Sequence, residues 1–149
     1  MSIKIKKCPT SNTKEFTKDE YLTSVAMHVS DVQKGCAFIA NKIIEAGINH
    51  DYTKISLADD FMDDAKLSGD EFRAGKWFQA HITKERHHFD KWPDNLNLID
   101  VIECLVDVTM AATARSGDIK ELQMDSEILQ EAFKNTFEML KKEIVIEED

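Results

Sequence analysis

Proline and glycine are scarce in this sequence, with two prolines and five glycines among 149 residues. Both residue types interrupt helices and form tight turns, so few positions are suited to ending a helix. Runs that alternate between polar and apolar residues, the pattern of a half-buried strand, are also few. These absences favour an all-α protein.

Positive charge is also in short supply. The chain has 19 lysines and arginines against 28 aspartates and glutamates, and its formal net charge is −9. A nucleic-acid surface needs a broad basic face that attracts phosphates, and this composition argues against one. A small phosphorylated molecule is still a suitable ligand, because a metal and two or three local cations can overcome a remote negative field.

Long apolar runs are absent. None approaches the roughly 20 residues that a membrane-spanning helix needs, and the first residues, MSIKIKKCPT, lack the apolar segment of a secretory signal. The three cysteines, Cys8, Cys36 and Cys104, form no CxxC motif. We interpret them as reduced thiols, with Cys36 and Cys104 in the core. The sequence therefore predicts a soluble, cytoplasmic protein.

Apolar residues recur every three or four positions, which predicts one domain over residues 1–149, a bundle of five to six helices. Residues 1–16 are expected to form a loose or strand-like arm, and residues 117–149 a last helix with a frayed acidic tail. Thr17 and Glu20 have capping-box spacing, which predicts the start of a long core helix ending near Gly47. Further helices are expected at about residues 56–65, with Ser56 as the cap, and at 70–92, 95–115 and 125–143.

All five histidines fall between residues 28 and 88. His28 lies beside the apolar stripe of the first helix. His81 and His88 are seven residues apart, so a helix would return them to nearly the same face, with Glu85 between them. His87 would point elsewhere on that helix, so only one of the adjacent pair needs to be a ligand. The alternative is that this segment, ERHH, is a solvated helix end.

Three acidic residues stand in the otherwise apolar segment LIDVIECLVDVTMAA. Their spacing by three and four places Asp100, Glu103 and Asp107 on one stripe of a helix. A solvent-facing stripe is the alternative, but Asp107 has apolar neighbours almost all round. A carboxylate buried there would need a metal or a cation as its partner. Imidazoles and carboxylates together suit a divalent transition metal such as Mn, Fe, Co, Ni or Zn.

The segment INHDYTKIS places His50 beside Asp51, with Lys54 three residues further on. A polar helix end capped by Asn49 or Asp51 is one interpretation. A metal-ligand pair with a cation for an anionic substrate is the other, and the remaining histidines and acids favour it.

The order of these residues, H…HD…H…HH…D from His28 to Asp107, resembles the HD superfamily of metal-dependent phosphohydrolases. The resemblance covers about residues 20–116, most of a predicted metal-site core at residues 17–116. It implies a helical HD-like fold with one or two divalent ions per chain. The implied primary ligands are His28, His50, Asp51 and Asp107, while His81 with His88, or with His87, would hold a second ion or a substrate phosphate.

The same resemblance implies hydrolysis of a phosphomonoester or phosphodiester by metal-activated water, with a nucleotide as the expected substrate. The expected catalytic residues are Asp51, Lys54 and Glu103. HDYTK is similar to the HD-x-x-K form, in which the lysine approaches the substrate's anion, and Glu103 would orient an imidazole or act as a general base. Further phosphate contacts are expected from three cations, for each of which a surface charge is the alternative: Lys84, Arg86 and Arg115.

Two other functions fit the same residues. An HD-fold diiron oxygenase would use a similar histidine-rich set to activate dioxygen. A non-catalytic protein would bind a nucleotide or a partner protein at this site. Iron content with an oxygen-dependent activity would identify the first, and unchanged bound nucleotide after long incubation the second. The oligomeric state is left open.

Overall fold

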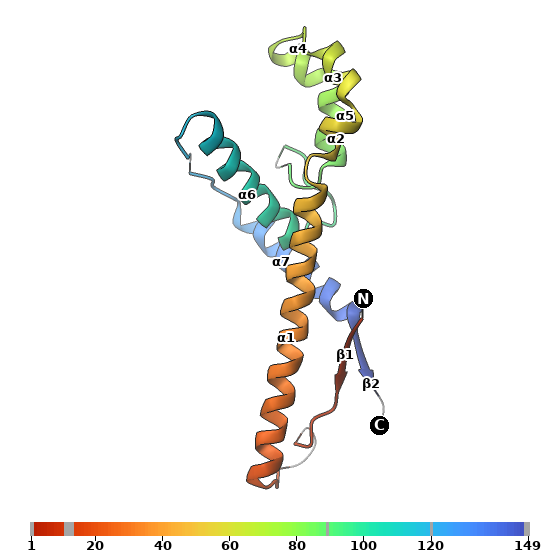
Figure 1. The fold of residues 1–149 in the computed structure, drawn as a ribbon, viewed down its shortest axis with the longest axis vertical. Helices are drawn as coiled ribbons and strands as arrows, with labels where there is room; N and C mark the ends of the chain where they lie inside the picture. Colours follow the sequence, from red (N-terminus) through yellow and green to blue (C-terminus); the bar gives the residue numbers. More distant parts are fainter. Residues whose placement is uncertain (1, 11–13, 89, 120, 148–149) are drawn as a thin grey trace. The chain divides into compact units, whose positions relative to one another are not determined.

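The computed structural model describes residues 2–10, 14–88, 90–119 and 121–147. Helices dominate, which confirms the predicted all-α class (Figure 1). The contacts divide the chain into two units, each described by itself below. One unit comprises Met1–Lys42 and Phe137–Asp149, and the other comprises Ile43–Thr136.

The first unit contains the small sheet of the described structure. Strand β1 (Ile3–Lys6) pairs in parallel with β2 (Ile144–Glu147), with Ile3 opposite Ile144 and Lys6 opposite Glu147. The isoleucines favour a pleated conformation, and Lys4 Nζ lies 3.3 Å from the Glu147 carboxylate. The predicted arm is thus a strand in part. The tail expected to fray is also a strand as far as Glu147, and residues 148–149 lie outside the described part.

Helix α1 (Lys18–Asn49) begins at the predicted capping box. The Thr17 amide donates to the Glu20 carboxylate at 2.7 Å, and the Glu20 amide donates to Thr17 Oγ1 at 3.2 Å. These bonds satisfy amide groups that a helix start leaves unpaired. The helix continues past the expected end near Gly47, since helix geometry accepts an isolated glycine at a cost of only about 1 kcal/mol.

Two faces of α1 differ within the first unit. The buried face holds Ser24 and Phe38, and Ser24 Oγ accepts a hydrogen bond from Thr10 Oγ1 at 3.0 Å. The apolar stripe that was expected to form a core is exposed by 41–50% at Leu22, Val25, Val29 and Val32. The expectation of a core stripe is wrong there, as is the core position of Cys36, which is exposed, whereas Cys104 is buried as predicted.

The second unit contains the end of α1 and a series of shorter helices. The helix expected at about residues 56–65 is present as Ala58–Asp64, but its N-cap residue is Leu57 and not Ser56, which ends an unpredicted short helix just before it. None of the described helices is both long and apolar enough to cross a membrane. The helices after α1 are α2 (Tyr52–Ser56), α3 (Ala58–Asp64), α4 (Gly69–Ala74), α5 (Lys76–Lys84), α6 (Leu98–Arg115) and α7 (Ser126–Glu143), the last of which ends in the first unit.

The single helix predicted at 70–92 is wrong, because the chain breaks at Gly75 and leaves the helix after Lys84. A Cβ atom at Gly75 would lie 2.7 Å from Asp64 Oδ2 and 2.9 Å from the Phe72 carbonyl oxygen. This close approach requires glycine. The Asp64 carboxylate also accepts the Trp77 amide at 2.7 Å, so it holds the start of α5 in place.

Helix α6 starts at a second capping box, in which Asn97 accepts the Ile99 amide and Asp100 accepts the Asn97 amide. Asp100 is buried and also accepts two bonds from the Arg86 guanidinium, both of 2.7 Å. A buried carboxylate with these partners is stable, so Asp100 anchors the helix and does not face solvent. The start of α6 is also bonded to α7, because the Leu98 amide donates to Thr136 Oγ1 at 2.8 Å.

Candidate metal centre

The centre is built around the turn between α1 and α2. Asp51 has φ 55 and ψ 26, and it is the one non-glycine residue with positive φ in the described part of the chain. Most residues pay about 1–2 kcal/mol in this left-handed region, which aspartate and asparagine enter more readily. The turn brings two neighbouring side chains together, since His50 Nε2 lies 3.2 Å from Asp51 Oδ2.

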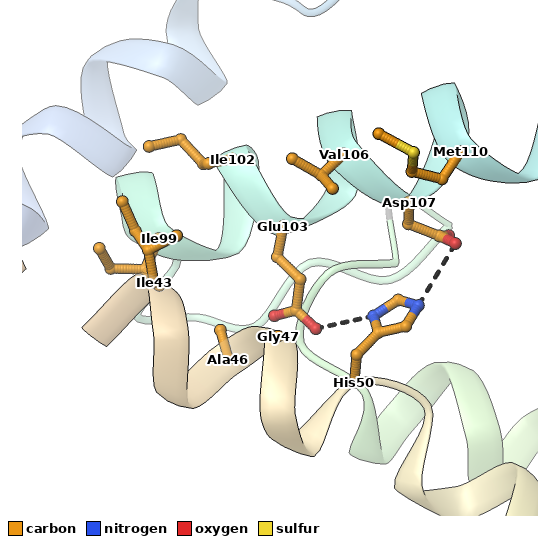
Figure 2. A pocket seen from close by; sticks show the side chains of 10 residues that line it. All are labelled: Ile43, Ala46, Gly47, His50, Ile99, Ile102, Glu103, Val106, Asp107 and Met110. Carbon is orange, nitrogen blue, oxygen red and sulfur yellow. Dashed lines mark hydrogen bonds and ion pairs between the residues drawn. The ribbon is translucent and has the colours of Figure 1, made fainter. Parts of the chain in front are cut away.

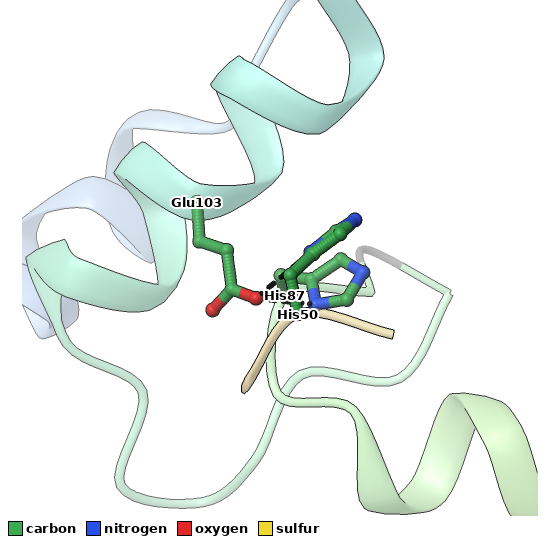
Figure 3. A group of neighbouring side chains, drawn as sticks. All are labelled: His50, His87 and Glu103. Carbon is green, nitrogen blue, oxygen red and sulfur yellow. Dashed lines mark hydrogen bonds and ion pairs between the residues drawn. The ribbon is translucent and has the colours of Figure 1, made fainter. Parts of the chain in front are cut away.

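One oxygen of Glu103 faces two imidazoles (Figure 3). His50 Nδ1 is hydrogen bonded to Glu103 Oε1 at 3.0 Å, and His87 Nδ1 lies 3.1 Å from the same oxygen. A carboxylate in this position favours a proton on Nδ1, which leaves Nε2 free to bind a metal ion. Glu103 thus sets the orientation of both rings.

The two Nε2 atoms face the same pair of carboxylates. His50 Nε2 is 3.3 Å from Asp107 Oδ1 (Figure 2). His87 Nε2 is 3.8 Å from Asp51 Oδ1 and 4.0 Å from Asp107 Oδ2. The Nε2 atoms of His50 and His87 therefore converge on the carboxylates of Asp51 and Asp107. We call His50, His87, Glu103 and Asp107 the Glu103 side of the centre.

A second pair of histidines lies near Asp51 Oδ1, the carboxylate oxygen that His87 also approaches. His81 Nε2 is 3.6 Å from Asp51 Oδ1 and 2.8 Å from His88 Nε2. Thr53 Oγ1 is 2.6 Å from His81 Nδ1 and donates to Glu85, which also accepts the Thr53 amide at 2.8 Å. Because the hydroxyl proton goes to Glu85, Thr53 accepts from His81 Nδ1. We call His81, His88, Thr53 and Glu85 the Thr53 side.

Several buried polar atoms at the centre have no hydrogen-bond partner among the described residues. They are Asp51 Oδ1 and both ring nitrogens of His87, whose 3.1 Å approach to Glu103 lacks hydrogen-bond geometry. Each such atom costs about 1–3 kcal/mol unless something binds it. A divalent transition metal is bound by imidazole nitrogen and carboxylate oxygen, so the donor set fits the predicted ion.

Asp51 belongs to most of the side-chain groups that could hold an ion. In each group the ligand atoms lie within 4.8 Å of one another. Asp51 is therefore placed to be shared by two ions, one on each side. The four groups are His50–His87–Glu103, Asp51–His87–His88, His50–Asp51–Asp107 and Asp51–His81–Glu85.

The electrostatic environment keeps the histidines of the Thr53 side neutral in the metal-free protein. Burial, with the help of the neighbouring His88, lowers the pKa of His81 from 6.5 to about 4. Burial and the neighbouring His87 also lower the pKa of His88. A metal binds the neutral form of imidazole, so these rings need not lose a proton first.

The Glu103 side behaves differently. Burial would lower the pKa of His87, but the Glu103 carboxylate outweighs it and the pKa is raised. Burial likewise opposes ionisation of Glu103, yet His87 and His50 hold its pKa below the usual value. The pKa of Asp51 is also lowered, because Lys54 and His50 outweigh burial. These carboxylates are therefore ionised at neutral pH.

Lys54 forms a short ion pair with Asp51 Oδ2 and has 45% of its side chain exposed. Its ammonium thus lies at the solvent edge of the centre, next to the shared carboxylate. The role of Lys54 towards a substrate stays a prediction.

Of the predicted ligands, the structure brings together His50, Asp51, His81, His88 and Asp107. His28 does not join them. It is exposed on the part of α1 that belongs to the first unit, about six helical turns before the end of that helix, and it is in none of the potential metal groups of the described residues.

His87 has a larger role than its sequence position indicated. The prediction that only one of His87 and His88 needs to be a ligand assumed a helix, in which adjacent residues point apart. Here α5 ends at Lys84, and residues 86–88 form a turn, so both rings reach Asp51. The helix ends because the Glu85 carboxylate bonds to Thr53, 32 residues earlier in the chain.

The three cations expected to contact phosphate lie elsewhere. Arg86 uses its guanidinium on Asp100 and Asn95, so that expectation is wrong. Lys84 and Arg115 are exposed at the ends of α5 and α6 and belong to no described contact with the centre. Sequence reasoning gave no role to Thr53. For Trp77 a core position was expected, with base stacking as the alternative, and the side chain is buried with its ring stacked on His81 at 4.8 Å between centroids.

Comparison with known proteins assigns the chain to a family but finds no individual relative. No curated protein and no solved structure matches the chain. One family model matches residues 17–147, which include all of the second unit and every residue of the centre. The chain therefore belongs to the family described as a family of unknown function, DUF5662.

Proposed function

We propose that this protein is a metal-dependent phosphohydrolase that acts on a small phosphorylated substrate. One observation carries the proposal. Four imidazoles and Asp107 surround the Asp51 carboxylate, and buried atoms of Asp51 and His87 have no hydrogen-bond partner in the described part of the chain. The ions would be held by His50, His87, Asp107 and Asp51 on one side, and by His81, His88 and Asp51 on the other.

A bound divalent ion would supply an activated water, whose pKa the ion lowers towards about 7, and would polarise a phosphoryl oxygen. The chain's own residues do the rest. Glu103 fixes the ring of His50 by a hydrogen bond to Nδ1, and the same oxygen lies 3.1 Å from Nδ1 of His87. Thr53 fixes His81 in the same way. Lys54, at the solvent edge, would neutralise charge on the non-bridging oxygens of a phosphoryl group.

The proposal is tested by a substrate screen on the purified protein after loading with Mn, Co or Fe. Nucleoside mono-, di- and triphosphates, cyclic nucleotides and simple alkyl and aryl phosphates would be incubated with the protein, and phosphate release measured. Nucleotides come first because a nucleotide is the expected substrate, although the HD resemblance by itself implies no particular one. Hydrolysis of any of these substrates that depends on the metal is the expected result. A metal-loaded protein inert on all of them would contradict the proposal, and oxygen uptake would then be measured.

Lys54 gives the sharpest test of the reaction type. Lys54→Ala should keep the metal but lose about 10²–10³-fold in turnover, the loss typical of removing one charge-stabilising donor. Lys54→Arg should recover only part of this activity, since a planar fork does not replace a compact ammonium. Lys66→Ala, which removes an exposed lysine of the same unit, is the matched control. Full activity in Lys54→Ala would remove the lysine from the mechanism.

A further inference from the structure

A cavity of about 270 Å³ lies in the second unit between the last turns of α1 and helix α6 (Figure 2). Most of its wall is apolar. In Figure 2, Ala46 points from α1 towards α6. At the rim, Val106 is 49% exposed and Met110 is 63% exposed, so the cavity opens to solvent. The apolar side chains of the wall are Ile43, Ala46, Ile99, Ile102, Val106 and Met110.

The polar part of the wall belongs to the metal centre. It consists of His50, Glu103 and Asp107, three members of the Glu103 side. Their polar atoms face one another, with His50 Nδ1 3.0 Å from Glu103 and His50 Nε2 3.3 Å from Asp107. A molecule bound in the cavity would therefore lie directly beside the centre, with the apolar wall around the part that is away from it.

We propose that the cavity binds an apolar alkyl or aromatic group of the substrate while the phosphoryl group lies at the metal centre. This inference rests on the proposed function and narrows its substrate class. The six apolar side chains offer no hydrogen bonds, so a sugar or another polar group placed against them would lose its bonds to water without replacement. An apolar group gains free energy in the same place.

The size and the flexibility of the wall agree with this assignment. A volume of about 270 Å³ is near the lower end of ligand pockets, which span about 300–1,000 Å³, so the site fits one ring or a short chain. Met110 at the rim is flexible and adapts to differently shaped apolar groups. A ligand there would also cover the exposed parts of Val106 and Met110.

Alkylphosphonates test this inference without any reaction, because their carbon–phosphorus bond is not hydrolysed. Binding of methyl-, ethyl-, propyl- and butylphosphonate to the metal-loaded protein would be measured by calorimetry. The affinity should rise about fourfold for each added methylene that is buried, which is the fold-change that burial of one methylene gives. Uniform affinity along the series would overturn the inference but leave the proposed function intact. Failure of all four to bind would contradict both.

Variants assign the effect to the cavity. Ala46→Leu should fill part of it, so methylphosphonate should bind as before while the gain with chain length disappears. Ala114→Leu makes the same change at an exposed position of α6 outside the cavity, and it should keep the gain. Val106→Thr preserves shape at the rim and avoids overpacking, and it should weaken binding of butylphosphonate alone. A gain with chain length that persists in Ala46→Leu and Val106→Thr would overturn the inference.

Discussion

The two sides of the candidate metal centre share Asp51 but differ in how many of their histidine ring nitrogens are hydrogen bonded by the protein. On the Thr53 side, His81 is held by a chain of hydrogen bonds through Thr53 to Glu85, and its ring stacks on Trp77. On the Glu103 side, one carboxylate oxygen serves both His50 and His87, and neither ring nitrogen of His87 has a hydrogen bond. The described hydrogen bonds therefore engage both ring nitrogens of His81 and neither of His87.

This difference predicts where an ion binds first. Unsatisfied buried atoms each cost about 1–3 kcal/mol, so an ion that bonds to them recovers that free energy in addition to its own coordination. The Glu103 side also has two carboxylates, Asp51 and Asp107, facing its Nε2 atoms, and the Thr53 side has Asp51 alone in that position. The first ion should therefore occupy the Glu103 side.

The largest effect is expected where the two sides meet. Asp51→Asn should abolish binding of both ions, since a neutral amide replaces the shared carboxylate. Asparagine tolerates the left-handed backbone at this position, so the helices should be retained. Elemental analysis and circular dichroism would measure the two outcomes, with Asp59→Asn on the exposed surface of α3 as the control. Wild-type metal content in Asp51→Asn would refute the assignment of the centre.

A smaller effect is expected from pH on the Thr53 side. In chelator-treated protein the folded-state pKa of His81 is about 4, against 6.5 ordinarily. Between these values the unfolded chain binds a proton that the folded chain does not. The free energy of unfolding should therefore fall as the pH falls from about 6.5 towards 4, by up to about 3 kcal/mol.

The contribution of His81 can be separated from the others by a variant. His87 acts in the opposite direction, because its raised pKa gives stability that is present below 6.5 and lost as the pH rises through the folded-state value. Urea unfolding of wild type and His81→Asn at pH 7, 6 and 5 would isolate the effect, since the amide can still donate to Thr53. His28→Asn, on the exposed part of α1, is the control. Equal pH slopes in wild type and His81→Asn would contradict the expectation.

The smallest effect on metal binding is expected from the residues that orient the imidazole rings, Glu103 and Thr53. Partners of this kind typically contribute 10–100-fold to metal affinity. Glu103→Gln should lie near the upper end of that range, because one oxygen orients two imidazoles, and Thr53→Val near the lower end, because it orients one. Metal titration of both variants measures the difference. If Thr53→Val lost more affinity than Glu103→Gln, the ranking of the two sides would be reversed.

Local patterns predicted much of the fold. The capping box at Thr17 and the periodicity of α1, α6 and α7 are properties of short segments, and these helices begin close to where the sequence placed them. The breaks at Gly75 and Glu85 could not be predicted, because each depends on a contact with a distant residue. Asp64 approaches Gly75 closely, and Thr53 bonds to Glu85.

The same limit explains the errors at the site. His50, Asp51, Glu103 and Asp107 were predicted from charges in apolar surroundings and from the HD pattern, and they lie together. His87 was not predicted as a primary ligand, because the prediction placed it on a helix and turned it away from His81 and His88. In the structure that helix ends before Glu85, which bonds to Thr53. His28 was included because it lies beside the apolar stripe of α1 and because the resemblance implies a ligand there. That stripe is exposed instead of buried, so the local argument for His28 fails with it.

The left-handed turn at Asp51 has a consequence for how this family can evolve. Aspartate, asparagine and glycine are the residues that accept such a backbone, and of these only aspartate provides a carboxylate. Codons for asparagine and glycine differ from those for aspartate by a single nucleotide. The carboxylate of the proposed metal centre can therefore be lost by one nucleotide change that the backbone of this turn accepts, and the residue at position 51 of a relative would show whether that carboxylate is kept.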